Sequence, residues 1–180
     1  MTIDDDRLSV GNGEKYRRAS DAAQVFYEEP RCVMGAFKNL AIVIWGTQAT
    51  LPLAEKLEAF SEDLVRRHPE GVSLVQIIAN QARLPESTTR HKLDKMTERF
   101  APHLACVGTV VEGSGFWASA MQSFITSLHW VSRRPFKVKI TSSLIELSTW
   151  LPKAHEERTR VRFTSPQFLS AAYSLRERIQ

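Results

Sequence analysis

Segments with the apolar spacing of β-strands alternate with amphipathic segments of helical spacing through most of this chain. Residues 40–46, LAIVIWG, form a continuous apolar run bounded by turn residues, which is typical of a strand covered on both faces. Residues 51–71 then repeat apolar side chains at steps of three and four, as one face of a helix does. These repeated positions are Leu53, Leu57, Phe60 and Leu64. The alternation predicts a sheet covered by helices, and neither an all-helical nor an all-antiparallel fold.

The same alternation continues to residue 151. Strands are expected at residues 72–79, 103–113 and 136–141, and helices at residues 87–100, 115–135 and 142–151. Residues 25–37 form a further β-rich run, expected to pair with residues 40–46 as a hairpin. Because right-handed crossovers return successive strands to one sheet, we expect an α/β fold with a single mostly parallel or mixed five-stranded sheet flanked by helices. Its buried layers are expected to contain Ile42, Ile44, Leu74, Val75, Ile77, Val107 and Val110.

One domain accounts for most of the chain. Its 180 residues, 43% of them hydrophobic, are enough for one core and too few for two. Residues 1–23 are polar and without period, so they are expected to be a flexible leader before a domain at residues 24–152. Residues 153–180 are expected to hold a charged linker, to about residue 164, and an extra C-terminal helix that begins with Ser165 and Pro166.

Composition indicates a soluble cytoplasmic protein. Cys32 and Cys106 lie in apolar runs, where buried thiols of a reducing compartment are expected. No basic start leads into an apolar stretch, and no window approaches the roughly 18 apolar residues of a membrane span. The net charge of +4 comes from dispersed cations opposed by 20 acids, which is a weak signal for nucleic-acid binding.

Three hydroxyls in a row, Ser87, Thr88 and Thr89, stand where the second helix is expected to begin. A hydroxyl at that place can cap the helix by accepting hydrogen bonds from unpaired backbone N–H groups, and this needs no function. Phosphorylation of Ser87 or Thr88 would instead add about two negative charges, which Arg83, Arg90 and the helix dipole could stabilise. A partner contact is the third interpretation.

No catalytic or metal-binding set is recognisable. Residues 112–116, EGSGF, favour a tight turn over an anion site, because they lack the P-loop and dinucleotide patterns, and Ser114 is not in a G-x-S-x-G elbow. The five histidines lack the paired spacings of metal sites. We therefore expect no enzyme activity, no metal and no cofactor.

The densest basic stretch, residues 133–139, contains Arg133, Arg134, Lys137 and Lys139. Two interpretations stay open. The lysines could guard an edge strand against aggregation, or the four cations could contact an acidic partner or a phosphate.

Apolar residues on the C-terminal helix and on the third helix each allow a structural and a functional interpretation. The C-terminal helix carries an apolar stripe that either packs on its own domain or grips another protomer or a partner protein. This stripe consists of Phe168, Leu169, Ala172, Leu175 and Ile179. The third helix carries Trp117, Met121, Phe124 and Trp130, which either belong to the core or line an apolar ligand pocket against the sheet.

The order of elements over residues 24–152 resembles the STAS-like superfamily (sulfate transporter and anti-sigma-factor antagonist), in a divergent form near its SEC14-like branch. The resemblance is carried by the passage IVIWGTQATL, by the strand VSLVQIIA before a hydroxyl-bearing helix start, and by the closing ELSTWL. In anti-sigma-factor antagonists a phosphorylatable serine begins the second helix, and here Ser87 or Thr88 lies near that place. The aspartate and glycine that accompany it in the family are absent from ANQARLPESTTR.

These observations lead to two expected functions. The first is a non-enzymatic regulatory or adaptor domain that acts in signalling through protein contacts or self-association, with phosphorylation at Ser87 or Thr88 as its candidate switch. The alternative is a small-ligand or lipid-binding module.

Overall fold

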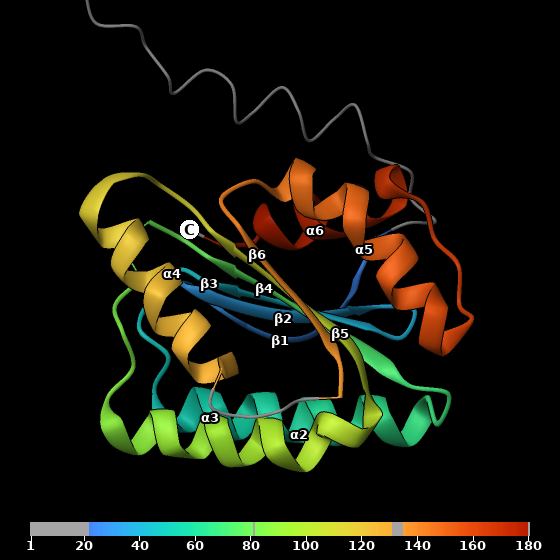
Figure 1. The fold of residues 1–180 in the computed structure, drawn as a ribbon, viewed down its shortest axis with the longest axis horizontal. Coiled ribbons are helices and arrows are strands. Elements are labelled where there is room, and N and C mark those ends of the chain that lie inside the picture. The colour runs from blue at the N-terminus through green and yellow to red at the C-terminus, as the bar shows by residue number, and fades with distance from the viewer. Residues whose placement is uncertain (1–21, 81, 131–134, 180) are drawn as a thin grey trace, which may run out of the picture.

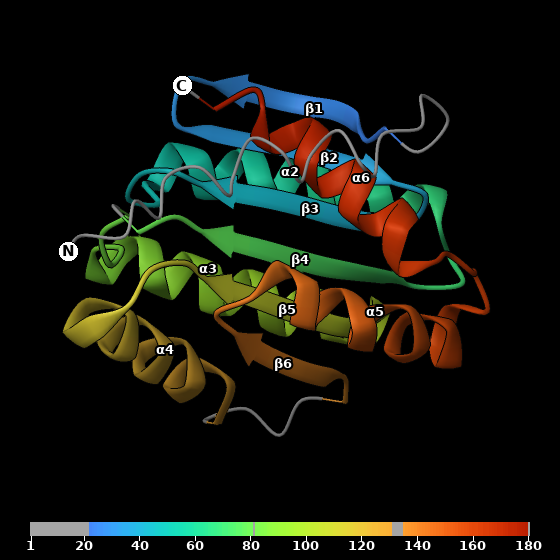
Figure 2. The ribbon, with the colours of Figure 1, turned by 90° about the horizontal axis from the view of Figure 1, so that it is seen from above.

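A computed structural model describes residues 22–80, 82–130 and 135–179, so nearly all of the expected leader lies outside the described residues. Six strands form one sheet in the order β1-β2-β3-β4-β5-β6. The pairs β1–β2 and β2–β3 are antiparallel and the later pairs are parallel, so the sheet is mixed (Figure 2). The strands are β1 (Gln24–Glu29), β2 (Cys32–Phe37), β3 (Leu40–Trp45), β4 (Val72–Ile78), β5 (Leu104–Val111) and β6 (Lys137–Thr141). The helices are α2 (Leu51–Arg67), α3 (Ser87–Phe100), α4 (Gly115–Trp130), α5 (Leu144–Thr159) and α6 (Ser165–Arg176), with a 3-10 turn, η3 (Ala101–His103), after α3.

The α/β prediction is confirmed, but the prediction of five strands is wrong. Residues 25–37, expected as one β-rich run, form the two strands β1 and β2, which pair up to Glu29 opposite Cys32. Between them lie Pro30 and Arg31. Proline has no N–H for a ladder bond, so the chain turns there and adds a strand at the edge of the sheet.

The helices cover both faces of the sheet. In Figure 1, α2 and α3 lie on one face and α5 and α6 on the other, while α4 lies beside α3. The arrangement follows from topology, because successive right-handed crossovers in one direction place their helices on the same face. Of the expected core residues, all but Leu74 are buried, and Leu74 is partly exposed because it lines a cavity described below.

Helix α5 is longer than expected. The chain was predicted to leave the helix near Pro152 and to continue as a charged linker, yet α5 runs through Pro152 to Thr159. Proline lacks the N–H that would bond the carbonyl of Ser148. The Ser165 hydroxyl donates to that carbonyl instead, at 2.6 Å, which satisfies it and fixes the start of α6 to α5.

Helix α6 packs on its own sheet. Phe168, Leu169 and Leu175 are almost completely buried in the cluster formed with β2, β3 and α5. The helix approaches the sheet closely at Gly35 on β2, where an added Cβ would lie 2.7 Å from a Leu175 methyl group. The apolar stripe is therefore packed against this chain's own sheet. Contact of this helix with a partner protein or a second protomer stays a prediction.

Candidate functional site

A cavity of about 100 Å³ lies between the sheet and the helices α3 and α4. Its floor is formed by Trp45 near the end of β3 and by Leu74, Gln76 and Ile78 on β4. Side chains two residues apart on a strand share one face, which explains how β4 contributes three floor residues. The cavity lies toward the carboxyl ends of parallel strands, where open α/β sheets commonly bind ligands.

The walls of the cavity are mainly apolar, and its rim carries the charged groups. Side chains from α2, α3 and α4 form the walls, and the segments that follow β3 and β4, together with Asp94 of α3, form the rim. The wall residues are Leu57, Leu93, Met96, Thr97, Met121 and Ile125, and the rim residues are Thr47, Ala49, Ala82, Arg83, Pro85 and Asp94. An apolar enclosure with a few polar groups is the usual composition of a small-molecule site.

The polar group on the floor has a defined orientation. The indole Nε1–H of Trp45 donates to Gln76 Oε1 at 3.3 Å. An indole N–H can only donate, so the amide oxygen faces Trp45 and the amide nitrogen takes the other position. Gln76 is thereby fixed with two N–H donors away from the indole.

Two side chains hold one side of the rim in place. Gln48 donates to the carbonyl of Leu84 at 2.6 Å, and the indole of Trp117 donates to the carbonyl of Ala82 at 3.1 Å. Of the predicted pocket residues, Met121 lines the cavity and Trp117 anchors its rim. The side chains of Phe124 and Trp130 lie outside the described part of the structure.

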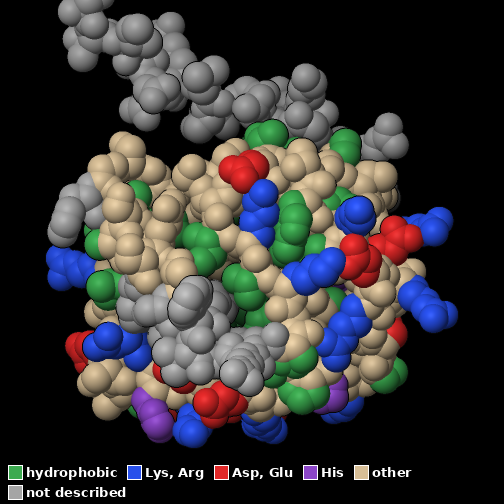
Figure 3. Space-filling view, viewed as in Figure 1, with side chains coloured by type: hydrophobic (Ala, Val, Ile, Leu, Met, Phe, Trp, Pro, Cys, Tyr) green, Lys and Arg blue, Asp and Glu red, His purple; other side chains and the backbone are tan. Residues whose placement is uncertain are grey.

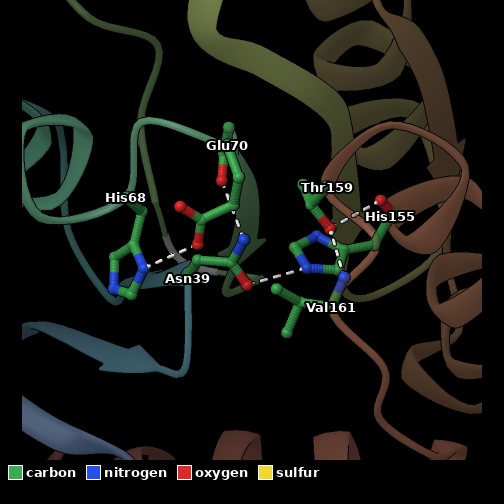
Figure 4. Close-up of polar contacts among 7 residues, drawn as sticks. Asn39, His68, Glu70, His155, Thr159 and Val161 are labelled. Carbon is green, nitrogen blue, oxygen red and sulfur yellow. Dashed lines mark hydrogen bonds and ion pairs between the residues drawn. The ribbon is translucent and has the colours of Figure 1, made fainter.

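A second polar cluster is buried at the opposite, amino-terminal end of the strands. His155 on α5 lies 2.9 Å, through Nε2, from Asn39 Oδ1 and 2.8 Å, through Nδ1, from Ser73 Oγ. Asn39 donates through its amide nitrogen to the Gly71 carbonyl at 2.7 Å, and Ser73 Oγ lies 3.2 Å from Cys106 Sγ. Figure 4 shows the His155 ring facing Asn39, with Thr159 and Val161 beside it.

The contacts of this cluster determine where its protons lie. Since the amide nitrogen of Asn39 bonds to Gly71, Oδ1 must accept, and Nε2 of His155 carries the proton. Nδ1 is then the acceptor for the Ser73 hydroxyl, and Ser73 in turn can accept the Cys106 thiol proton. While His155 is neutral, Asn39, His155 and Ser73 therefore each have a hydrogen-bond partner in this cluster.

The serine, histidine and asparagine side by side do not form a nucleophilic site. All three are 0–1% exposed, so no substrate reaches them. Burial first, and the charge of Lys38 second, lower the pKa of His155 to about 4. Burial raises the pKa of Cys106 to about 11, so its thiol stays protonated. The cluster binds β3, β4, β5 and α5 together. Sequence reasoning missed it because His155 fell in the expected linker.

The second cysteine, Cys32, is buried, as the sequence predicts. Cys32 is fully buried, and burial raises its pKa to about 12. Both cysteines are free.

The hydroxyl triplet does not cap α3. The N-cap residue is Glu86, whose side chain makes no capping hydrogen bond, and Ser87 is the first residue of the helix. Ser87 and Thr88 are exposed, whereas Thr89 is buried. The capping interpretation is therefore wrong, and the two exposed hydroxyls lie in the first helical turn.

The predicted cationic residues that the structure describes lie on α3, before α3 and on β6. Arg83 and Arg90 are exposed near the start of α3, and Arg83 lines the cavity rim. Lys137 and Lys139 on the edge strand β6 form ion pairs with Glu157 and Glu146 of α5. On the face seen in Figure 3, basic side chains are interspersed with acidic ones. Arg133 and Arg134 lie outside the described residues.

The glycine-bearing turn after β5 contacts other segments of this chain. Glu112 forms a bidentate ion pair with Arg176 near the end of α6. Gly113 adopts a positive φ of 96° and packs against Asn80, whose Oδ1 would lie 2.3 Å from an added Cβ. The turn thus joins two loops and α6, in agreement with its structural interpretation.

A scan against protein-family models finds no match for this sequence, and a comparison with curated proteins finds none either. Over the described residues, no group of three or more His, Cys, Asp or Glu side chains could hold a metal ion. No helix there has both the length and the apolar character needed to cross a membrane.

Proposed function

We propose that this protein binds a small, mainly apolar ligand in the cavity between the sheet and helices α3 and α4. The observation that carries the proposal is the cavity itself. It is lined by side chains from β3, β4 and three helices, it opens at the carboxyl side of parallel strands, and it contains one oriented amide on an apolar floor. Met121 links this cavity to the pocket predicted from the sequence.

Ligand binding is supported better than an adaptor role that depends on the C-terminal helix. The stripe on α6 was the clearest candidate for a protein partner, and it is buried against β2 and β3. The cavity is a concave surface that no side chain fills.

We propose a binding module that catalyses no reaction. Among the described residues, Ser73 and His155 form a hydrogen-bonded serine–histidine pair that is buried in the core, and Asp94 is the only carboxylate that lines the cavity. The relation to the STAS-like superfamily stays part of this proposal. It is supported by the order of elements in residues 24–152, in which an antiparallel hairpin precedes alternating helices and parallel strands.

Filling the cavity tests the proposal. In Leu93→Trp the indole should occupy the space between α3 and the floor, and affinity for α-methylstyrene, measured by NMR titration, should fall by roughly tenfold or more as apolar burial is lost. Leu84→Trp is the control, because Leu84 is 42% exposed beside the rim and does not line the cavity. No binding to the wild-type protein, or equal binding to both variants, would refute the proposal.

A regulatory role at the start of α3 is the second candidate. Ser87 and Thr88 are exposed in the first turn, where a phosphate would meet unpaired N–H groups and the positive end of the helix dipole. Arg83 and Pro85, which precede them, line the cavity rim. A phosphate there would place new charge beside the entrance and so couple modification to ligand access.

A further inference from the structure

We propose that the ligand is an uncharged molecule that carries a hydrogen-bond acceptor, such as a carbonyl oxygen, and places it on the amide nitrogen of Gln76. This inference rests on the proposed ligand-binding function and adds the chemical class of the ligand and its orientation. The apolar body, a ring or a short branched chain, would lie between α3 and α4.

The Gln76 amide nitrogen is the donor that such a ligand requires. Trp45 fixes the amide oxygen, so rotation of the amide would place two donors face to face. Within the described part of the chain, the amide nitrogen has no acceptor of its own. The nitrogen is not among the buried atoms that lack a partner, so it can donate to water while the cavity is empty. A ligand acceptor that replaces this water makes a direct neutral hydrogen bond, which strengthens binding by roughly three- to tenfold.

The neighbouring strand carries another polar side chain. Thr109 on β5 is paired in register with Gln76, so the two side chains share one face of the sheet. Thr109 is fully buried, and its hydroxyl has no partner among the described residues. Thr109 does not line the cavity, so its hydroxyl lies beside the floor and is not a second contact for the ligand.

Cavity size and rim charge narrow the ligand class further. An enclosed apolar cavity of about 150 Å³ holds benzene, so a cavity of about 100 Å³ that opens to solvent takes one ring or a short branched chain. Among the described rim residues, Arg83 is the only cation and Asp94 the only anion. Because these charges oppose each other, the rim selects neither an acid nor an amine.

A pair of probes with the same shape isolates the acceptor. Acetophenone and α-methylstyrene differ in that a carbonyl oxygen replaces a terminal CH₂ group. We expect Gln76→Met to weaken the binding of acetophenone relative to α-methylstyrene by roughly three- to tenfold, the value of one neutral hydrogen bond. Gln122→Met is the control, because Gln122 lies on α4 outside the cavity lining and its loss should leave the ratio unchanged.

A measurement on the wild-type protein guards against misfolding of the variant, in which Trp45 loses its acceptor. The rings of both probes shift the ¹H and ¹⁵N resonances of the Gln76 side-chain amide, but acetophenone should move the amide ¹H resonances further downfield, because only its carbonyl accepts a hydrogen bond. If both probes bind but the affinity ratio does not change in Gln76→Met and the two probes give the same amide shifts, the orientation proposed here is wrong while ligand binding stands. If neither probe binds, the proposed function fails, and this inference fails with it.

Discussion

At the scale of single residues, the neutral state of His155 is the most consequential feature. Protonation would place a charge in the core and would remove the acceptor that Ser73 requires at Nδ1. The pKa of His155 in the folded protein is lowered to about 4, from an ordinary value of about 6.5. Above pH 6.5 the histidine is neutral in both the folded and unfolded chains, and the fold keeps its full stability.

Stability should fall between pH 6.5 and pH 4, because only the unfolded chain then takes up the proton. From pH 7.5 to pH 5.0 we expect a loss of roughly 2 kcal/mol, since each pKa unit corresponds to about 1.4 kcal/mol. Urea unfolding followed by tryptophan fluorescence measures this change. His155→Gln should be less stable at pH 7.5, because it breaks the chain of hydrogen bonds, and should lose little more at pH 5.0. Equal stability of the wild type at both values would contradict the argument.

The sequence predicted several residues of the cavity, but of this cluster it predicted only the burial of Cys106. Met121 was named from its helical spacing, and Arg83 from its place before a helix. Asn39, Ser73, Cys106 and His155 come from four separate segments, and nothing local marks them as neighbours. The available signal was the spacing of Leu147, Leu151, Ala154 and His155, which continues the buried face of a helix past Pro152.

At the scale of elements, the start of α3 determines what its hydroxyls can do. Ser87 is the first helical residue and not the cap, so Ser87→Ala should change the free energy of unfolding by no more than about 0.5 kcal/mol. Ser87→Asp should raise it by roughly 0.3–1 kcal/mol, because a negative charge in the first turn favours the helix dipole. Chemical denaturation measures both. A loss near 1 kcal/mol in Ser87→Ala would restore the capping interpretation.

The same substitutions bear on the regulatory candidate. If phosphate enters at this turn, peptide mass spectrometry of the protein from its own cells should find it on Ser87 or Thr88. Ser87→Asp should then alter acetophenone affinity, while Ser87→Ala should not. A chain without phosphate at either position would remove this candidate.

Helices and strands with strong periodicity were predicted well, and the errors came at prolines. Pro30 was placed within one β-rich run and instead separates β1 from β2. Pro152 was expected to end a helix and instead lies inside α5. Pro152 can stay inside a helix because another group replaces the hydrogen bond that it cannot make. Ser165 supplies a donor to the freed carbonyl in α5, and a contact between residues this far apart is not visible in a local pattern.

At the scale of the whole molecule, α6 belongs to the core. Leu175→Ala should cost about 2–5 kcal/mol, because Leu175 is fully buried against β2. Ile145→Ala is a suitable control, since Ile145 is 43% exposed on α5 and should cost little. Urea unfolding gives the stability and light scattering gives the molar mass. If Leu175→Ala keeps its stability but changes the molar mass, α6 is an interface helix after all.

The position of α6 also has a consequence for the order in which the fold can be completed during synthesis. Ala23, just before β1, bonds to Ser174 of α6, 151 positions later, and α6 covers β2 and β3. At about 5–20 residues per second, a ribosome needs on the order of ten seconds to make the chain from the end of β3 to the start of α6. Throughout that interval one apolar face of β2 and β3 lacks its cover. These strands are therefore enclosed only after a helix that is made much later, and folding must wait for contacts of high sequence separation.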